Sequence, residues 1–335
     1  MTTFDTRTRL WLPERAPAVH TVRTPEVEIV TPLGVQGRWN WALLNRGGEP
    51  VRSSGGWHKN LIVDSGLDSL AANPAMGYCA VGSNNTDPDV SQTALLAQVG
   101  VRTSSNGGFS QISNNNVGNL YSQIIRTFLF DFNECNGNLT EVGLFDSSGG
   151  GKMFMRQLFM DGPTKTVVVK TSDFQLKIQY EYRLYWYNAE DTFSMMVNGA
   201  SRTVLQRRSA NSGWTLNADR ALGVQGTEAN LHGGGAAFNT AGNAPSGGQQ
   251  IRWETNVIGN YVNGSFFRDY SVRWGASVAN GVEYTILALS PYTGSAYDSI
   301  KVDLTNLGAS GAGVTKSNTQ RFVVNFRRAW TRYTP

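Results

Sequence analysis

The stretch FQLKIQYEYRLYWY, Phe174 to Tyr187, alternates between two kinds of residue over its whole length. Every second residue from Leu176 to Trp186 is aliphatic or aromatic, and most of the residues between them are polar or charged. This period of two predicts a β-strand with one buried face. A strand of about fourteen residues is far longer than the usual five or six, and its polar face carries Tyr185 and Tyr187. We therefore expect the strand to continue past its own sheet into contact with another copy or another protein.

Most of the remaining chain has the same character. Short alternating runs are separated by segments rich in turn residues, such as CNGN, MDGPT and KTSD. Strands at this spacing predict an all-β fold of antiparallel, sandwich-like domains. RWNWALLNRGGEPVRSSGGWHKNLI, from Arg38, predicts a hairpin that turns at Gly47-Gly48. Further predicted strands cover residues 78–83, 124–132, 139–145, 153–158, 166–169, 271–275, 282–289, 300–304 and 321–330.

Only two short helices are predicted. In VDSGLDSLAANP, Asp64 or Ser65 can cap a helix that ends before Pro74. SQTALLAQVG predicts a second helix, between a cap at Ser91 and Gly100.

The sequence divides into three predicted regions. Residues 1–36 contain four prolines and no sustained periodicity, which predicts an extended N-terminal arm. Residues 37–189 form a β-sandwich-like assembly domain with the short helices, and residues 190–335 form a second all-β domain that contains a Gly-rich loop, LHGGGAAFNTAGNAPSGGQQ.

The arm is expected to reach onto a neighbouring subunit. Its candidate contact residues are Leu10, Trp11 and Leu12. The segment VEIVTPLGV, Val27 to Val35, alternates enough to add as an edge strand to a neighbour's sheet.

Composition narrows the range of partners. The 335 residues carry a net charge of +4, and 16% of them are charged. Lys and Arg form no dense run, so nucleic-acid binding is not expected. No stretch is apolar for long enough to predict a signal peptide or a membrane span, so no membrane insertion is expected. Cys79 and Cys135 are expected to be free thiols, with a bridge between them left open.

Motifs for catalysis are weak. The three histidines lack metal-ligand spacing, and SSGGGKM (147–153) matches a glycine-rich hairpin turn better than a phosphate loop. HGGG (232–235) resembles an esterase oxyanion segment, but no Gly-x-Ser-x-Gly motif accompanies it. We predict no catalytic residue, no cofactor and no metal, and leave open whether the NNTDPD turn (84–89) binds an ion such as calcium.

Aromatic residues offer two interpretations. Trp253, Tyr261, Phe266 and Phe267 have polar neighbours and could stack on sugar rings, which makes them candidate glycan contacts. The interpretation that we favour is that they fill a core or a subunit interface, where Trp and Tyr are enriched.

Several segments together resemble a group of tailed-bacteriophage virion proteins usually labelled tail fibre or minor tail proteins. The segments are GRWNWALLNRGGEPVRSSGGWHKNLIVDSGLDSLA (37–71), YCAVGSNNTDPDVSQTALLAQVG (78–100), NGNLTEVGLFDSSGGGKMFMRQLFMDGPTKTVVVKTSDFQLKIQYEYRLY (136–185) and FVVNFRRAW (322–330). The resemblance is strongest over about residues 37–187, extends through YVNGSFFRDYSVRWG (261–275), and is weak in the arm and the Gly-rich loop. One departure is FNECNGN, where Glu134 and Cys135 occupy a position expected to be small and apolar.

The resemblance implies a virion structural protein that is made in the bacterial host cytoplasm and released by lysis. We expect it to form a homo-oligomer, first of all a trimer, and to contact other virion proteins. The alternatives left open are a head decoration or head fibre protein, a module that binds host surface polysaccharide, and a polysaccharide depolymerase. The depolymerase would need paired carboxylates, for which Asp269 with Glu254 or Glu283 is the local grouping.

Overall fold

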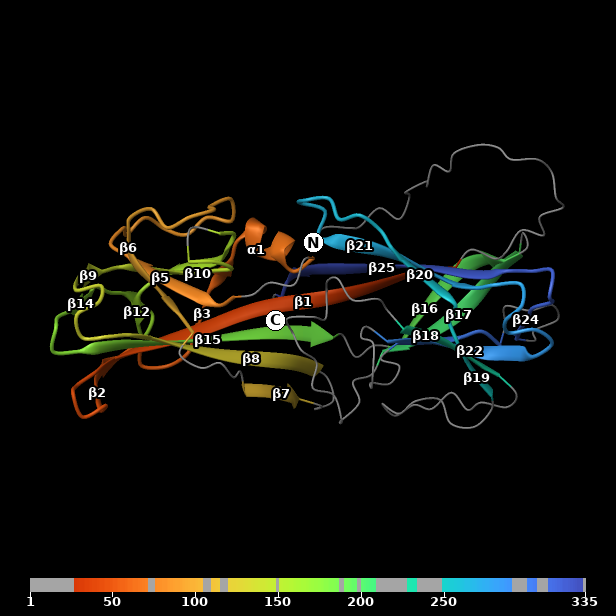
Figure 1. Ribbon diagram of the computed structural model, residues 1–335, viewed down its shortest axis with the longest axis horizontal. Coiled ribbons are helices and arrows are strands. Elements are labelled where there is room, and N and C mark those ends of the chain that lie inside the picture. The colour runs from red at the N-terminus through yellow and green to blue at the C-terminus, as the bar shows by residue number, and fades with distance from the viewer. Residues whose placement is uncertain are drawn as a thin grey trace.

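The computed structural model describes residues 27–71, 76–104, 110–114, 120–148, 151–186, 190–197, 200–208, 228–233, 249–290, 300–305 and 313–333. These residues form an all-β fold with one short helix, which confirms the predicted fold class. The molecule is elongated, with a lobe at each end and long strands running between the two lobes (Figure 1).

The long strands belong to one central sheet, in the order β20-β21-β25-β1-β15-β8-β7, with β2 and β3 also paired to β1. β1 pairs antiparallel with β15 along residues 33–44 and parallel with β25 along residues 27–35. The strands of this sheet are β1 (Val27–Leu44), β2 (Pro50–Ser53), β3 (His58–Lys59), β7 (Ser110–Asn114), β8 (Leu120–Phe130), β15 (Gln175–Trp186), β20 (Thr255–Ile258), β21 (Phe267–Trp274) and β25 (Phe322–Arg332).

Two predictions about the long strands are corrected here. Residues 27–36 are not part of an extended arm, because they lie in β1, where 27–35 pair with β25 of the same chain. Pro32 is tolerated because β1 pairs with β15 only from Leu33 onward, so its other side is an edge at the proline. β15 does not leave its own sheet, since β1 and β8 flank it over nearly its whole length. Residues 1–26 lie outside the described part of the chain.

The first lobe places a five-stranded sheet, in the order β4-β11-β10-β5-β6, against the β1–β15–β8 part of the central sheet. Two small strand pairs, β12–β13 and β9–β14, complete the lobe. The strands of the lobe are β4 (Leu61–Ile62), β5 (Tyr78–Gly82), β6 (Gln98–Thr103), β9 (Gly137–Leu139), β10 (Glu141–Phe145), β11 (Met153–Leu158), β12 (Met160–Asp161), β13 (Thr164–Lys165) and β14 (Val168–Lys170).

Both edges of this five-stranded sheet touch the central sheet. On one side, the chain leaves β3 and enters β4 through Asn60, whose backbone N–H donates to the Gly37 carbonyl at 3.2 Å. On the other side, Ser104 forms a β-bridge with Phe128 of β8. The two sheets therefore meet at two corners.

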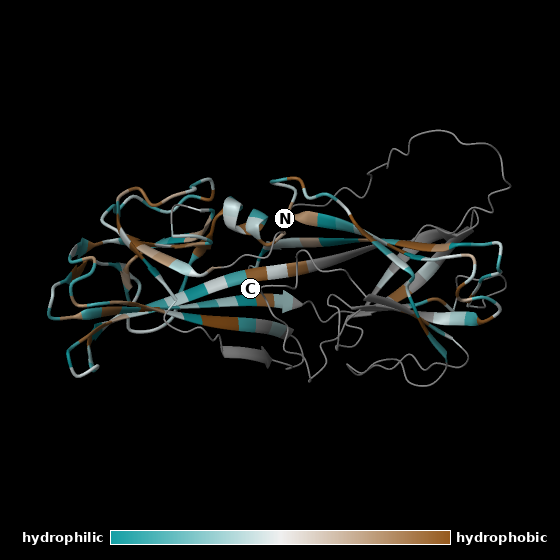
Figure 2. Cartoon of the chain, viewed as in Figure 1, coloured by the Kyte–Doolittle hydropathy of each residue, from teal (hydrophilic) through white to brown (hydrophobic). Residues whose placement is uncertain are grey.

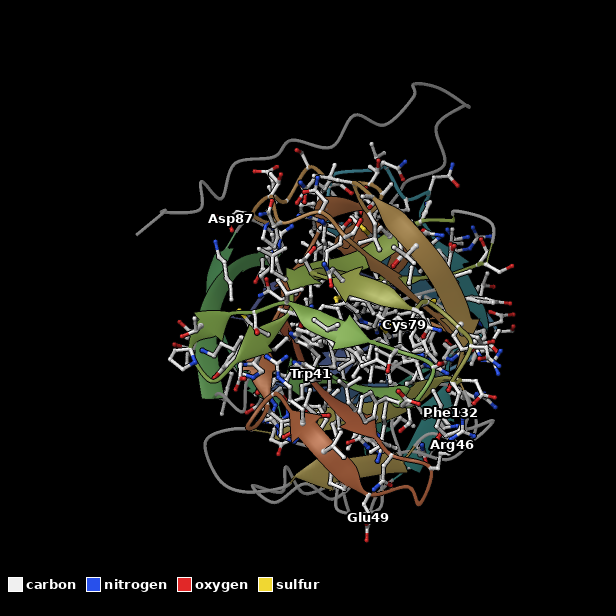
Figure 3. All side chains as sticks on the ribbon, turned by 90° about the vertical axis from the view of Figure 1, so that its left-hand side faces the viewer. Trp41, Arg46, Glu49, Cys79, Asp87 and Phe132 are labelled. Carbon is white, nitrogen blue, oxygen red and sulfur yellow. The ribbon has the colours of Figure 1, made fainter. Side chains whose placement is uncertain are left out.

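A large hydrophobic core, which we call the first core, fills the space between the two sheets of the first lobe. Trp39, Trp41, Ile178, Tyr180 and the remaining inward residues of β1, β15 and β8 pack against Val81, Val142 and Leu144 of the facing sheet. Figure 3 shows Trp41 and Cys79 within the side chains that fill the lobe, and Glu49 and Asp87 at its surface. The buried face predicted for 174–187 is confirmed from Leu176 to Leu184, but Glu181, on the predicted polar face, is also buried, where it pairs with Arg38 and Arg183.

The second lobe is a seven-stranded sheet, in the order β16-β17-β23-β22-β18-β19, with β24 paired to β22. Its strands are β16 (Glu190–Val197), β17 (Ala200–Arg208), β18 (Glu228–Gly233), β19 (Gln249–Arg252), β22 (Glu283–Ser290), β23 (Ile300–Asp303) and β24 (Val314–Thr315). Leu231, Tyr284 and Leu287 of this sheet pack against β21 and β25 in a second core.

One strand contributes to both cores. Phe322, Val324 and Phe326 of β25 lie in the second core, and Trp330 on the same face lies in the first. Arg328 is buried between them, with its guanidinium over the Tyr270 ring at 4.9 Å. Figure 2 shows hydrophobic and hydrophilic residues following each other along the long strands, as this alternation requires.

The helix predictions have different outcomes. The first helix is confirmed as α1 (Asp64–Ser69), but the predicted cap at Asp64 or Ser65 is wrong, because the N-cap is Val63 and no side chain caps the helix. The second is wrong, because residues 91–97 are irregular and Gln98 begins β6. Its Leu96 and Ala97 N–H groups donate to the Glu141 carboxylate, at 3.3 and 2.8 Å, instead of to helical carbonyls.

Candidate functional site

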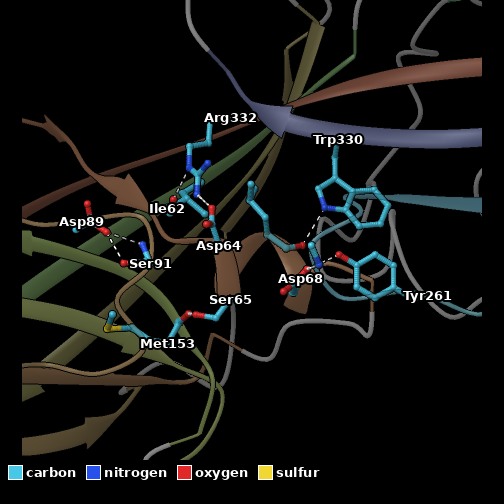
Figure 4. A network of polar contacts seen from close by, with 12 residues as sticks. Ile62, Asp64, Ser65, Asp68, Asp89, Ser91, Met153, Tyr261, Trp330 and Arg332 are labelled. Carbon is cyan, nitrogen blue, oxygen red and sulfur yellow. Dashed lines mark hydrogen bonds and ion pairs between the residues drawn. The ribbon is translucent and has the colours of Figure 1, made fainter. Parts of the chain in front are cut away.

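The two lobes are joined by a network of polar contacts around α1, which we call the junction (Figure 4). The carboxylate of Asp68, in α1, accepts hydrogen bonds from the Tyr261 hydroxyl at 2.5 Å and the Gly264 backbone N–H at 2.7 Å. Tyr261 and Gly264 belong to the loop between β20 and β21. A side chain in the first lobe therefore fixes a loop nearly two hundred residues further along the chain.

Trp330 of β25 forms the apolar centre of the junction. Its indole N–H donates to the Leu67 carbonyl at 2.9 Å, and its backbone N–H donates to the Phe266 carbonyl, also at 2.9 Å. The ring of Tyr261 stacks on the indole, with the ring centroids 5.6 Å apart. Trp330 is fully buried, so helix, loop and strand are held by one side chain.

Two arginines extend the junction on either side. Arg332 Nε donates to the Ile62 carbonyl at 2.6 Å, and its guanidinium pairs with Asp64. Arg268 donates to the carbonyls of Ala71 and Gly259, each at 2.9 Å. Guanidinium groups suit this role because several fixed N–H donors can satisfy backbone carbonyls from different segments.

Burial raises the pKa of Tyr261 well above its ordinary value, and the hydrogen bond to Asp68 and the charge of that carboxylate raise this pKa further. The phenol therefore stays protonated and remains a donor to Asp68. Phe266, beside it, has a positive φ of 52°, a conformation that non-glycine residues adopt only where surrounding contacts impose it.

The four candidate glycan aromatics do not form one platform. Tyr261 and Phe266 pack against the first core, and Trp253 packs against the second. The Arg327 guanidinium covers the Phe267 ring at 3.7 Å. Trp253 precedes β20 and Tyr261 follows it, so the two rings lie at opposite ends of that strand.

The candidate partner contacts fall in different places. Leu10, Trp11, Leu12 and Tyr187 lie outside the described residues. Tyr185 was expected to be exposed, and this expectation is wrong. Its side chain is only 6% exposed, its hydroxyl donates to Gln36 at 2.8 Å, and its ring stacks on a C-terminal tyrosine, Tyr333, with the centroids 3.8 Å apart.

The carboxylates considered for catalysis are used in separate contacts. Asp269 binds Arg327 through both oxygens, at 2.7 and 3.0 Å. Glu254 accepts from the Gly275 N–H at 2.7 Å. Gly275 follows the C-terminal end of β21, whereas Asp269 lies near the start of that strand. Glu254 and Asp269 are therefore held near opposite ends of β21, about five residues or roughly 16 Å of strand apart, and do not face a common point as a glycosidase carboxylate pair does. Glu283 lies in the other sheet and accepts from the Gly313 N–H at 2.6 Å.

A long irregular segment, residues 83–97, is the second functional candidate, and we call it the Ω-loop. Its ends meet where the Ser83 N–H donates to the Ala97 carbonyl at 2.9 Å. Compact loops of this kind are frequently functional. Leu95 is buried against the outer face of the five-stranded sheet, whereas Leu96, next to it, and Val99, in β6, are about half exposed.

A buried ion pair holds the Ω-loop in place. Glu141 and Arg156 are both fully buried, and their charged groups lie 2.8 Å apart. Glu141 also accepts the two N–H groups of the loop described above, and Arg156 donates to the Gln92 side chain at 3.0 Å. A buried charge pair needs such additional hydrogen bonds to offset its desolvation.

In the turn NNTDPD, at the start of the Ω-loop, Asn84 and Asp89 make local hydrogen bonds, and Asp87 pairs with Lys165. The Asn84 side chain accepts from the Thr86 N–H at 2.8 Å, and Asp89 accepts from the backbone and hydroxyl of Ser91. These Ser91 hydrogen bonds lower the pKa of Asp89. Within the described ranges, no three His, Cys, Asp or Glu side chains gather closely enough to hold a metal ion.

Other motifs have simple structural roles. SSGGGKM connects β10 to β11, and these strands pair antiparallel, as the predicted hairpin requires; residues 149–150 of the segment lie outside the described part of the chain. Both cysteines are free thiols, as expected. Among the described residues, no helix combines the length and the apolar character needed to cross a bilayer.

Comparison with known proteins yields no relative. No protein-family model matches the chain, and no curated protein and no solved structure matches it either.

Sequence reasoning missed the junction and the ion pair. Asp68, Arg268 and Arg332 are ordinary surface-type residues in the sequence, and their partners lie far away along the chain. Glu141 begins a strand that is otherwise apolar, EVGLF, and Arg156 interrupts the apolar strand MFMRQL; two opposite charges inside buried strands were the available signal.

Proposed function

We propose that this protein is a structural component of a bacteriophage virion, located in the tail or a tail fibre, where it mediates assembly. The resemblance of residues 37–187 to tail fibre and minor tail proteins supplies the class. The observation that carries the proposal is the central sheet, because its strands β1 and β25 run from one lobe to the other. The junction adds further contacts that hold the two lobes together. An elongated body with continuous strands can hold two attachment points at a fixed distance.

The use of the polar side chains supports the same proposal. Asp68, Asp269, Glu141 and Glu254 each bind groups of their own subunit, so these side chains contribute to rigidity. In the proposal, contacts to other subunits come from residues 1–25 and from the outer surfaces. We keep the expected homo-oligomer, with a trimer first, and contacts with other virion proteins as part of the proposal.

The head decoration or head fibre alternative rests on the same features and differs only in position on the particle. Host attachment through surface polysaccharide has less support than the sequence suggested, because two of its four candidate glycan contacts, Tyr261 and Phe266, pack within the junction. The depolymerase alternative likewise loses its carboxylate pair to separate structural contacts.

The test is localisation in purified particles combined with the size of the isolated protein. We expect immunogold electron microscopy to place the protein on the tail, and light scattering to give an oligomer. A deletion of residues 1–25 is the matched variant, because β1 begins at Val27 and is left intact. This variant should fold and fail to enter particles. A monomer that is absent from the virion would overturn the proposal, and labelling of the capsid would favour the head alternative.

A further inference from the structure

Two cysteines from different parts of the first lobe approach each other on one face of the β5–β6 pair. Cys79, in β5, is fully buried and points into the first core together with Val81. Cys135, in the turn between β8 and β9, packs against the same core and is half-buried. The two thiols therefore face a common space from opposite sides.

The position of Cys135 is fixed by its contact with β6. A Cβ built on Gly100 would lie 2.5 Å from Cys135 Sγ, so the sulfur occupies the space of a side chain at residue 100. Gly100 pairs with Val81, and Cys79 pairs with Arg102, which makes Gly100 and Cys79 diagonal neighbours on one face. Diagonal neighbours lie about 7–8 Å apart, and their Cβ atoms lie somewhat closer. Because the Cys135 sulfur lies beside the Cβ position of residue 100, a movement of the turn by roughly 2–3 Å would bring the two sulfurs within reach of a bridge.

The turn that contains Cys135, residues 131–136, is held by hydrogen bonds from a buried lysine, Lys170 of β14. Lys170 Nζ donates to the carbonyls of Asp131 and Phe132, at 2.8 and 3.3 Å, and to the Asn136 side chain at 2.9 Å. All three ammonium protons are thus directed at this turn. The turn is anchored at both of its ends, and Cys135 lies between the anchors.

Glu134 fixes the turn from the other side. Its carboxylate accepts from the Asp131 N–H at 2.8 Å and from Arg102 at 2.6 Å. Arg102 is the cross-strand partner of Cys79, so this ion pair ties the turn to the neighbourhood of the buried thiol. Cys135 itself has a φ of 53°, a strained conformation for a residue other than glycine.

We propose that Cys79 and Cys135 form a redox-active dithiol that closes to an intramolecular disulfide and fastens the 131–136 turn to β5. The oxidant is a small-molecule disulfide, such as oxidised glutathione. The Cys135 thiolate attacks this disulfide and releases one small thiol, which leaves a mixed disulfide on Cys135. Cys79 then loses its proton and attacks Cys135 Sγ, which releases the second small thiol. The protein gives up two electrons and two protons, and the oxidant is reduced to two thiols.

The order of the two attacks follows from burial. Burial is the main factor that raises the pKa of Cys79, and Cys135 raises it further. Burial and the charge of Glu134 raise the pKa of Cys135, and the charges of Lys170 and Arg102 partly offset that rise. The half-buried Cys135 is therefore the entry point for the oxidant. This inference does not depend on the proposed function.

The test is mass spectrometry of the native protein incubated with oxidised glutathione, with peptide mapping under non-reducing conditions. We expect both free thiols to disappear, no glutathione to remain attached, and peptides containing Cys79 and Cys135 to be cross-linked. In Cys79→Ala the second step is impossible, so Cys135 should retain a glutathione adduct. In Cys135→Ser the buried Cys79 should remain a free thiol.

Two results would overturn the proposal. One is a stable glutathione adduct on Cys135 of the wild-type protein with Cys79 still free, because it would show that the thiols cannot meet. The other is a wild-type protein that keeps both thiols free at oxidant concentrations and times that modify an unfolded sample completely. Neither result depends on the variants being folded.

Discussion

Glu141 and Arg156 illustrate how single residues stabilise the first lobe. Both side chains are fully buried, and each also binds the Ω-loop, at Leu96, Ala97 and Gln92. Removing one member of such a pair leaves the other charge buried without compensation, which is far more costly than losing an exposed pair.

We predict that Glu141→Gln lowers the free energy of unfolding by about 3–5 kcal/mol, because Arg156 keeps its charge in a dry environment. Asp87→Asn is the control, since Asp87 pairs with Lys165 at the surface and should cost about 1 kcal/mol or less. Urea unfolding measures both. Equal effects in the two variants would show that burial does not distinguish the pairs.

The Tyr261 hydroxyl leads to a pH-dependent prediction. Its folded-state pKa is raised above the ordinary value of 10.0, so the folded state holds this proton more tightly than the unfolded state does. Stability from this group is complete at lower pH and is lost as pH rises above about 10, where the unfolded tyrosine ionises first. Tyr261→Phe should cost about 1–2 kcal/mol at neutral pH and should lose less stability at alkaline pH. Urea midpoints across a pH series measure this, and parallel curves would contradict it.

For single residues, the sequence predicted well which side chains are buried and predicted poorly which other side chains they contact. Leu176, Ile178 and Phe322 are buried as their periodicity indicates. Tyr185 was misplaced because periodicity put it on the polar face, and the aromatic and amide groups that cover it come from Gln36 and Tyr333. No local pattern in the sequence encodes such a long-range contact.

The Ω-loop and α1 show how tertiary contacts decide between elements of similar sequence. Both segments have helical spacing of apolar residues. α1 forms because its buried face, including Leu67, packs against the first core. The Ω-loop does not form a helix, because the Glu141 carboxylate accepts hydrogen bonds from N–H groups that would otherwise donate to helical carbonyls. Tertiary context of this kind commonly overrides helix propensity.

A glycine substitution tests the packing of α1. A Cβ on Gly66 would lie 2.1 Å from the Phe154 carbonyl oxygen of β11. Gly66→Ala should therefore lower the free energy of unfolding by about 1–3 kcal/mol, although alanine favours an exposed helix by about 1 kcal/mol. Gly47→Ala, in an exposed turn, is the control and should change stability by about 0.5 kcal/mol or less. Thermal or urea unfolding decides, and a stabilised Gly66→Ala protein would contradict the described packing.

At the scale of the whole molecule, the first and last described strands lie side by side. β25 pairs with β1 on one side and with β21 on the other, and the Tyr333 N–H donates to the Val35 carbonyl at 2.7 Å. The sequence predicted a strand over residues 321–330, close to the C-terminus. Its partner was not predictable, because a parallel pairing between residues about 300 positions apart leaves no local signal.

Two truncations test the role of β1. Deleting residues 1–25 leaves β1 intact and should leave the unfolding temperature nearly unchanged. Deleting residues 1–36 removes the part of β1 that pairs with β25 and should sharply lower the unfolding temperature or abolish soluble expression. Circular dichroism melting compares the two proteins. If both truncations melt alike, residues 27–36 are not needed by the central sheet.

The central claim is that the two lobes share one sheet and act as a single rigid body. Differential scanning calorimetry tests this claim most directly, because a cooperative unit has equal calorimetric and van't Hoff enthalpies. We predict one transition in which both lobes unfold together with the central sheet. Two separate transitions, each with its own enthalpy and each assignable to one lobe, would contradict the account.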